Sequence, residues 1–240
     1  MTQEKDKQLI FDKVKEYYQN HLATKTRSRI PVSGKSFDEN ELIKAVDAAL
    51  DCWWTEGRYS DEFSEKFKKY TGSKFVSLVN SGSSANLVAL SALCSEKLKD
   101  KKLKKGDEVI TLAAGFPTTV NPIIQNNLVP VFCDIDIDTH NINIDSMKKA
   151  LSDKTRAVMI AHTLGNPFNL NEVVKFCEEN KLWLVEDCCD ALGSKYDGEL
   201  IGKKGHVSTF SFYPAQHITM GEGGAITTQD PILYKIVNSI

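Results

Sequence analysis

The sequence has little arginine, no extended apolar run and no block of basic residues. Arg occurs only at positions 27, 29, 58 and 156, so lysine carries nearly all of the positive charge, and the formal net charge is −2. A chain of this kind is not expected to bind nucleic acid or an anionic membrane surface. The N-terminal segment MTQEKDKQLIFDKVKEYY lacks the apolar core of a signal peptide, and no later segment is apolar enough to span a bilayer. We therefore expect a cytoplasmic protein without a nucleic-acid or membrane partner.

The cysteines form neither a CxxC pair nor a disulfide framework. They are Cys52, Cys94, Cys133, Cys177, Cys188 and Cys189. In a chain without a leader sequence we expect reduced thiols, most of which are small residues of the core.

The N-terminal part of the sequence predicts three helices. Apolar residues at helical spacing predict a helix over 3–22, and Ser36 or Asp38 can cap a second helix over 38–54. The polar stretch 24–37 between them contains Pro and Gly, which is typical of a loop or an extended arm. A third helix is expected over 60–71, with Gly72 beyond its end.

From residue 74 onward, apolar β-branched runs alternate with helical patterns. Strands are expected over 74–80, 107–112, 129–135, 155–162, 182–189, 207–213 and 224–228. Helices are expected over 83–98, 117–125, 145–151 and 169–180, and a last one from 231 is still in progress where the chain stops at 240. Strands joined by helical crossovers predict an α/β domain with a mostly parallel, buried sheet flanked by helices.

Two of the expected strand ends carry residues suited to a phosphorylated, flat ligand. The segment NSGSSAN at 80–86 places small residues at a helix N-terminus, where backbone N–H groups can bind phosphate. An ordinary N-cap by Ser81 or Ser83 explains the same segment equally well. Phe116, in GFPTT, can cover the face of a heteroaromatic ring, although an isolated Phe is more often part of the core.

A third strand end is acidic. After the apolar run LWLV come Glu186, Asp187 and Asp190, at the point where a parallel sheet opens its ligand crevice. A carboxylate there can pair with a protonated pyridine nitrogen, whereas capping of the next turn accounts equally well for Glu186. His162 ends the strand over 155–162, and a lone His in such a place is more often structural than catalytic.

The loop SFYPAQHITMGEGG, at 211–224, resembles the cofactor-lysine loop of the sugar aminotransferases of the DegT/DnrJ/EryC1/StrS type, which use pyridoxal phosphate. In that family the sixth position of the loop is the Lys that binds the cofactor covalently. Here the sixth position is Gln216, followed by His217. The resemblance implies the large domain of a fold-type I aminotransferase over 36–240, preceded by a helix and arm over 1–35 and without the family's small C-terminal domain.

The same resemblance implies a role for each strand-end residue. Ser83, Ser84 and Ser211 would contact the cofactor phosphate, and Phe116 would stack on the pyridine ring. Asp187 would pair with the ring nitrogen, Asp190 stands where many members have Gln, and His162 would line the site. This implied set of cofactor-binding residues therefore comprises Ser83, Ser84, Phe116, His162, Asp187, Asp190 and Ser211.

The segments AAGFPTTVNP, MIAHTLGN, WLVEDCCDALG and HITMGEGGA are most similar to the iron–sulfur 3-dehydrases that act on CDP-4-keto-6-deoxyglucose. In that branch a His replaces the Lys, pyridoxamine phosphate is held without a covalent link, and a flavin/iron–sulfur reductase is the partner of a homodimeric enzyme. Cys189 matches a ligand of the branch's [2Fe–2S] cluster, but no counterparts of the other ligands are present, so we do not expect this chain to assemble one.

Three hypotheses remain, and they differ in the role of residue 216. Gln216 has neither a titratable nitrogen nor an amine, and the adjacent His217 is a candidate substitute only if it points the same way. The chain is therefore interpreted as a 3-dehydrase of weak or no activity, as a nucleotide-sugar aminotransferase, or as a non-catalytic member of the family. The aminotransferase is disfavoured because Lys203 and Lys204 come too early in the loop pattern.

Overall fold

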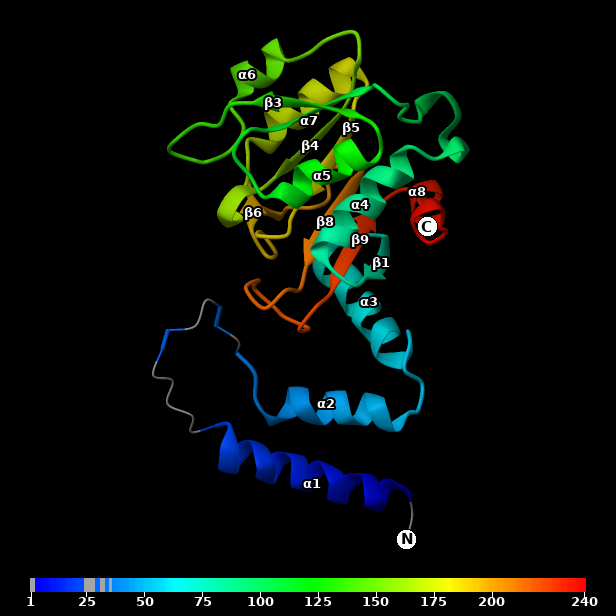
Figure 1. The fold of residues 1–240 in the computed structure, drawn as a ribbon, viewed down its shortest axis with the longest axis vertical. Coiled ribbons are helices and arrows are strands. Elements are labelled where there is room, and N and C mark those ends of the chain that lie inside the picture. Colours follow the sequence, from blue (N-terminus) through cyan, green and yellow to red (C-terminus); the bar gives the residue numbers. More distant parts are fainter. Residues whose placement is uncertain (1–2, 24–28, 31–32, 35) are drawn as a thin grey trace. The chain divides into compact units, whose positions relative to one another are not determined.

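The structure is a computed structural model that describes residues 3–23, 29–30, 33–34 and 36–240. It divides into two compact units, residues 1–63 and 64–240, which are drawn in Figure 1. Most of the expected arm over 24–37 lies outside the described residues. The assignment of domains to 1–35 and 36–240 stays a prediction.

The first unit contains α1 (Gln3–His21), α2 (Glu39–Leu50) and the beginning of α3 (Arg58–Thr71). Asp38 is the N-cap of α2: its side chain accepts from the Asn40 N–H at 2.7 Å, and Glu41 accepts from the Asp38 N–H at 2.7 Å. This reciprocal pair is a capping box, and it selects Asp38 over Ser36. The helix ends at Leu50, earlier than the expected residue 54.

Asp47, on α2, joins the three helices of this unit. Its carboxylate accepts from Lys7 Nζ on α1 at 2.9 Å, and from Arg58 Nη2 and the Tyr59 hydroxyl on α3 at 2.7 Å each. The hydrogen bond from Arg58, followed by those from Tyr59 and Lys7, holds the pKa of Asp47 well below its ordinary value. The carboxylate therefore stabilises the unit in its ionised form.

The second unit is built on a sheet of seven strands within the described residues. They are β1 (Phe75–Val79), β2 (Glu108–Leu112), β3 (Val129–Cys133), β4 (Thr155–Ala161), β5 (Trp183–Asp187), β8 (Val207–Ser211) and β9 (Gly224–Thr228), in the order β1-β9-β8-β5-β4-β2-β3. The strands β3, β2, β4, β5 and β8 run parallel, whereas β9 is antiparallel to β8 and β1. The expected mostly parallel sheet is confirmed.

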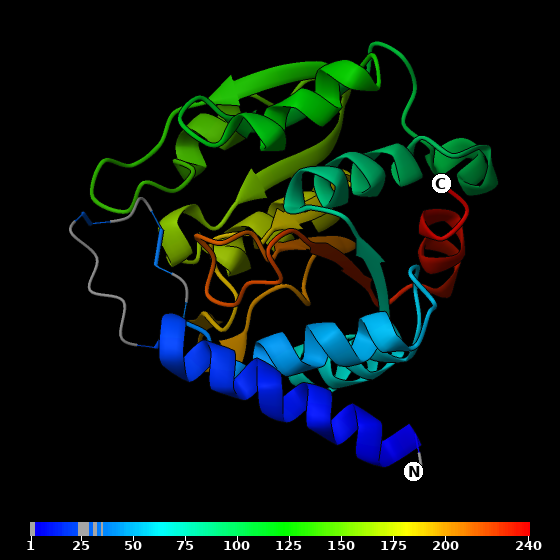
Figure 2. The same ribbon diagram turned by 60° about the horizontal axis from the view of Figure 1, so that its bottom comes forward.

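Helices cover both faces of this sheet, as Figures 1 and 2 show from two directions. One core contains residues of α4 (Gly82–Leu93), α5 (Pro117–Gln125) and α8 (Pro231–Val237), and the other contains residues of α6 (Ile144–Lys149) and α7 (Leu170–Asn180). Neighbouring residues of a strand serve different cores: Val158 belongs to the second and Met159 to the first. The second half of α3 adds Phe67, which packs edge-on against Phe210 with ring centroids 5.1 Å apart.

Some local expectations were wrong. The helix expected over 83–98 ends at Leu93 and is followed by a 3-10 segment, Glu96–Lys101. The last helix ends at Val237, so the chain does not stop inside a helix. A small hairpin of β6 (Lys195–Tyr196) and β7 (Glu199–Leu200) was not expected.

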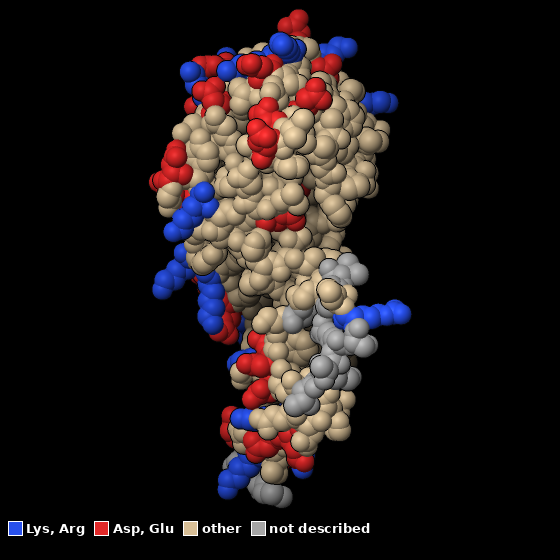
Figure 3. Space-filling model, turned by 90° about the vertical axis from the view of Figure 1, so that its left-hand side faces the viewer, with Lys and Arg blue, Asp and Glu red and all other residues tan. Residues whose placement is uncertain are grey.

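No helix in the described residues is long and apolar enough to cross a bilayer. At the upper end of the face shown in Figure 3, which belongs to the second unit, basic and acidic side chains are interspersed. At this end the charges therefore do not form a patch of one sign.

We predict that Asp47→Asn destabilises the packing of the helices of the first unit. The neutral amide cannot replace the carboxylate that accepts hydrogen bonds from both Lys7 and Arg58. Since the pKa of Asp47 is depressed in the folded chain, its contribution is present above the carboxyl group's ordinary pKa and is lost as the pH falls below it. Hydrogen exchange of α1 and α2 at pH 7 should be faster in Asp47→Asn. Asp12→Asn, which alters an exposed carboxylate of α1, is the control. Equal exchange in both variants would contradict the prediction.

Candidate functional site

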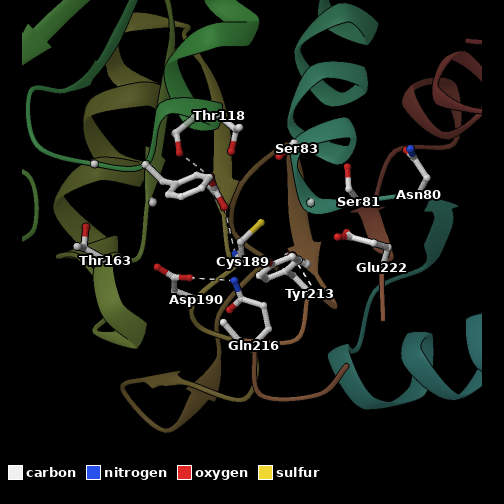
Figure 4. A pocket seen from close by; sticks show the side chains of 18 residues that line it. Asn80, Ser81, Ser83, Thr118, Thr163, Cys189, Asp190, Tyr213, Gln216 and Glu222 are labelled. Carbon is white, nitrogen blue, oxygen red and sulfur yellow. Dashed lines mark hydrogen bonds between the residues drawn. The ribbon is translucent and has the colours of Figure 1, made fainter. Parts of the chain in front are cut away.

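A cavity of about 900 Å³ opens at the carboxyl ends of the parallel strands β2, β4, β5 and β8. Figure 4 shows that side chains from separate strand ends face this common space. In open α/β sheets this edge is where ligands bind. The cavity is lined by Asn80, Ser81, Gly82, Ser83, Gly115, Phe116, Thr118, Thr119, Ala161, Thr163, Asp187, Cys189, Asp190, Ser211, Tyr213, Ala215, Gln216 and Glu222.

The N-terminus of α4 forms one wall of the cavity. Ser81 is the N-cap, and its hydroxyl accepts from the Ser84 N–H at 3.1 Å. The N–H groups of Gly82 and Ser83 have no acceptor within the described part of the chain, as expected for the first turn of a helix. Two N–H donors and the positive end of the helix dipole are therefore available to an anion such as a phosphate.

This helix end lies very close to the ends of β8 and β9. A Cβ atom on Gly82 would lie 2.5 Å from Ser211 Cβ and 2.9 Å from Cys189 Sγ. A Cβ atom on Gly224 would lie 2.3 Å from the Ser81 carbonyl oxygen. Only glycine fits at these two positions. The close contact between the α4 N-terminus and the ends of β8 and β9 places Ser83 and Ser211 on the wall of the same cavity.

Asp187, at the end of β5, is the buried carboxylate of the cavity and 4% exposed. Its Oδ2 accepts from Asn86 Nδ2 at 2.8 Å and from the Thr119 hydroxyl at 2.7 Å, and its Oδ1 accepts from the Cys189 N–H at 3.1 Å. All three partners are donors in these bonds, which suits a carboxylate because it can only accept. Sequence analysis did not identify Asn86 and Thr119 as partners; their only signal was a polar residue on an otherwise apolar helix face.

Phe116 is 67% exposed and lines the cavity rather than the core. It is the N-cap residue of α5 and makes no side-chain cap hydrogen bond. Thr163, on another part of the wall, has a buried hydroxyl without a partner among the described residues. An exposed aromatic ring and a free hydroxyl in one cavity are features of a site for a flat polar molecule.

Gln216 also lines the cavity, in the loop between β8 and β9. Its Nε2 donates to Asp190 Oδ1 at 3.2 Å, and this pair is visible at the lower side of Figure 4. His217 is exposed and is not among the lining residues. The structure therefore brings Gln216 and Asp190 into the site and leaves His217 outside it.

His162 does not line the cavity, contrary to expectation. It is fully buried, its Nε2 lies 3.1 Å from Glu186 Oε2, and its Nδ1 accepts from the Phe168 N–H at 3.3 Å. The reason is the alternation of a strand: Ala161 lies opposite Asp187 on the cavity side, so the next residue points to the other face with Glu186. His162 is thus a structural residue.

Glu186 is likewise part of the core on that second face. Burial opposes its ionisation, but His162 and the N–H groups of Gly205 and Gly202 outweigh burial, so the pKa of Glu186 is lowered. The side chains of His162, Glu186 and Cys188 bring potential metal ligands within 4.8 Å of one another. Because the His162 and Glu186 side chains already form hydrogen bonds with each other and with the backbone, we interpret this group as a structural cluster and not as a metal site.

Ser84 and Cys189 complete the expected residues. Ser84 is not among the lining residues, and its hydroxyl accepts from that of Ser81 at 3.1 Å. Cys189 does line the cavity, and burial, followed by the charge of Asp187, raises the pKa of its thiol well above the ordinary value. No group of three or more candidate ligands in the described residues includes Cys189, so they do not match the four-ligand set of a [2Fe–2S] cluster.

The residues present do fit a pyridoxal or pyridoxamine phosphate. The lining contains the carboxylates Asp187, Asp190 and Glu222 and, within the described residues, no Lys, Arg or His. A phosphate would therefore rely on the Gly82 and Ser83 N–H groups and on the helix dipole. Phe116 and Asp187 would serve the ring, the first by contact with its face and the second by accepting the proton of its nitrogen.

Comparisons with known proteins agree with this geometry. The profile of the "DegT/DnrJ/EryC1/StrS aminotransferase family" matches residues 36–240. The lipopolysaccharide biosynthesis protein RfbH of Salmonella typhimurium is 55% identical over 212 residues, which are 88% of this chain and 48% of that protein. The dTDP-4-dehydro-2,6-dideoxy-D-glucose 3-dehydratase of Saccharopolyspora spinosa is 50% identical over 208 residues, 87% of this chain and 45% of the relative. The chain thus spans about half the length of these relatives.

Solved structures confirm the expected fold. The GDP-4-keto-6-deoxy-D-mannose-3-dehydratase of Escherichia coli with bound hydrated PLP superposes with a TM-score of 0.81 at 38% identity, covering 88% of this chain and 54% of that one. An aminotransferase from Psychrobacter cryohalolentis gives a TM-score of 0.80 at 30% identity, over 87% and 52% of the two chains. The α/β unit has the fold of the large domain of a fold-type I aminotransferase.

We predict that Gly224→Ala destabilises the second unit and displaces the N-terminus of α4. The new methyl group would collide with backbone atoms of Ser81, which cannot move as a side chain would. Overpacking of this kind costs about 1–3 kcal/mol, which corresponds to a fall of roughly 2–12 °C in Tm for a unit of this size. Gly115→Ala is the control, since its Cβ would meet nothing closer than 3.9 Å. If Gly224→Ala and Gly115→Ala melted at the same temperature, the contact between Gly224 and the Ser81 backbone would be less tight than the structure shows.

Proposed function

Because the chain belongs to the DegT/DnrJ/EryC1/StrS aminotransferase family, we propose that it holds pyridoxamine phosphate for the 3-dehydration of a nucleotide-linked 4-keto-6-deoxyhexose in lipopolysaccharide sugar synthesis. The observation that carries the proposal is the convergence of the α4 N-terminus, Phe116 and Asp187 on one cavity, whose lining among the described residues contains no lysine. The chain spans about half the length of these relatives, so the activity of the whole protein is part of the proposal.

Five residues of the cavity have a defined task under this proposal. The N–H groups of Gly82 and Ser83, with the Ser83 and Ser211 hydroxyls, bind the phosphate. Phe116 covers one face of the ring, and Asp187 accepts the hydrogen bond of the ring nitrogen. When bound, the cofactor supplies an amine for the sugar's keto group and a ring that can take up an electron pair.

Residue 216 favours a dehydratase over an aminotransferase. Gln216 offers no amine for covalent attachment of the aldehyde form, and neither Lys203 nor Lys204 is among the described lining residues. The relatives do not agree on the nucleotide of the substrate, because the 3-dehydratases among them are named for dTDP and GDP sugars. We assign CDP-4-keto-6-deoxyglucose on the similarity of the loop segments, together with a homodimeric enzyme that receives electrons from a flavin/iron–sulfur reductase.

A non-catalytic, cofactor-binding protein is the second candidate, and the Gln216–Asp190 hydrogen bond favours it. An amide at this position holds the carboxylate but cannot accept a proton as a base does. The two candidates share the cofactor site and differ only in turnover. The experiments below separate them.

We expect the unaltered chain to bind pyridoxamine phosphate and Asp187→Ala to bind it about 10-fold or more weakly, because a charge-assisted hydrogen bond is worth roughly 1.5–3 kcal/mol. Equilibrium dialysis with detection at the cofactor's near-ultraviolet band measures both affinities. Glu199→Gln, which neutralises an exposed carboxylate outside the cavity, should bind as the unaltered chain does. Absence of binding by the unaltered chain would end the cofactor proposal.

Substitution of residue 216 should restore the chemistry that Gln lacks. Gln216→Lys should become covalently attached to pyridoxal phosphate, because it places an amine in the cavity. Borohydride reduction and mass spectrometry of the modified peptide measure the attachment. His217→Lys is the matched control: it introduces the same amine one residue away, outside the lining, and should stay unmodified.

Gln216→His should raise the rate of 3-dehydration of CDP-4-keto-6-deoxyglucose in the presence of pyridoxamine phosphate. A positioned base is worth about 10²–10⁴-fold in rate. A gain would identify a 3-dehydratase site that lacks its base, whereas binding without any turnover in either form would identify the non-catalytic candidate. Fast turnover by the unaltered chain would contradict the role given to residue 216.

A further inference from the structure

Asn86 is a buried amide in the middle of an otherwise apolar helix face. It lies on α4, is 0% exposed and is surrounded by Ala85, Ala89 and Leu90, which are also fully buried. A buried amide without partners is costly, so its hydrogen bonds indicate why it is tolerated. Both of its polar atoms are engaged with residues far away in the sequence.

The two hydrogen bonds of Asn86 fix its orientation. Thr209 Oγ1, on β8, donates to Asn86 Oδ1 at 2.6 Å, and Asn86 Nδ2 donates to Asp187 Oδ2 at 2.8 Å. A carboxylate can only accept, so the NH₂ group has to face Asp187 and the carbonyl has to face Thr209. The hydroxyl of Thr209 thus holds the amide with its donor directed at the carboxylate.

The same helix carries the anion-binding end of the cavity. Asn86 follows the N-cap Ser81 by little more than one turn, and Gly82 and Ser83, between them, line the cavity. The α4 helix therefore determines the position of the phosphate-binding N–H groups and, through Asn86, the direction in which Asp187 presents its oxygens. Thr119 adds a second donor to the same oxygen from α5.

We propose that Asn86 is a positioning residue for the cofactor's ring nitrogen, acting through Asp187, with Thr209 holding the amide in the required orientation. The proposal rests on the proposed function, since it requires a cofactor with a pyridine nitrogen. It assigns no contact between Asn86 and the cofactor. The amide and the Thr119 hydroxyl occupy Oδ2, so that the carboxylate meets the ring in a fixed orientation.

The test compares two ligands that differ at a single atom. One is pyridoxal phosphate, and the other is its carbocyclic analogue, in which a C–H group replaces the ring nitrogen. The unaltered chain should prefer pyridoxal phosphate. In Asn86→Leu the affinity for pyridoxal phosphate should fall about 10-fold. The affinity for the analogue should change little, because the analogue has no ring nitrogen to form a hydrogen bond with Asp187. Equilibrium dialysis of the full chain measures all four dissociation constants.

Further variants separate positioning from simple loss of structure. Thr209→Val removes only the hydroxyl that orients the amide and should also reduce the preference for the nitrogen, while Thr209→Ser should retain it. Ser91 lies on the same helix as Asn86 but does not line the cavity, and its hydroxyl donates to Asn126 Oδ1, at the end of α5. Ser91→Ala removes this hydrogen bond and should leave the preference unchanged. These variants keep the test decisive if Asn86→Leu does not fold.

Two outcomes would overturn the inference while leaving the cofactor proposal standing. Equal weakening of both ligands in Asn86→Leu and Thr209→Val would assign Asn86 a structural role only. An unchanged preference in both variants would show that Asp187 needs no such support. If the unaltered chain bound neither ligand, the proposed function itself would be wrong and the inference would fall with it.

Discussion

The site depends on the absence of two side chains. The first turn of α4 can lie against the ends of β8 and β9 only because Gly82 and Gly224 have no Cβ atom, and any larger residue would meet backbone or Ser211 at less than 3.0 Å. This contact brings the unpaired N–H groups of the helix to the carboxyl edge of the sheet. It also brings Asn86 within hydrogen-bond distance of Asp187, which lies at the end of a strand more than 100 residues later.

Much of the fold followed from the sequence because apolar strands alternate with helices from β1 to β5. The pattern did not predict the direction of β9. This strand follows β8 through a loop and not through a helical crossover, so it runs antiparallel to β8 and lies between β8 and the edge strand β1. The ends of α2 and α4 were also misjudged. The α2 helix ends before Cys52, which has a positive φ angle, and α4 ends before Ser95, whose backbone is extended.

Some residues of the site can be recognised from their place in the sequence pattern, and others only from the folded structure. Asp187, Phe116 and Ser83 stand at strand or helix ends, and these could be recognised from the sequence. The expectation for His162 was wrong because the alternation of side chains along the strand was not considered. Ala161 pairs with Asp187, so the next residue, His162, points to the opposite face of the sheet. Asn86 and Thr209 could not be found in this way, since their role exists only when α4, β5 and β8 come together.

The charge of the cavity constrains the ligand beyond the family resemblance. Three carboxylates line it, and the described lining contains no cationic side chain to compensate them. A bound phosphate is then favourable only at the α4 N-terminus, and a cationic group, such as a protonated ring nitrogen or an amine, is favourable near Asp187 and Asp190. A zwitterionic amine cofactor matches both ends of the cavity, whereas an aldehyde lacks the second positive group. Under the proposed function, this distribution of charge supports our choice of pyridoxamine phosphate, the form that needs no lysine at residue 216.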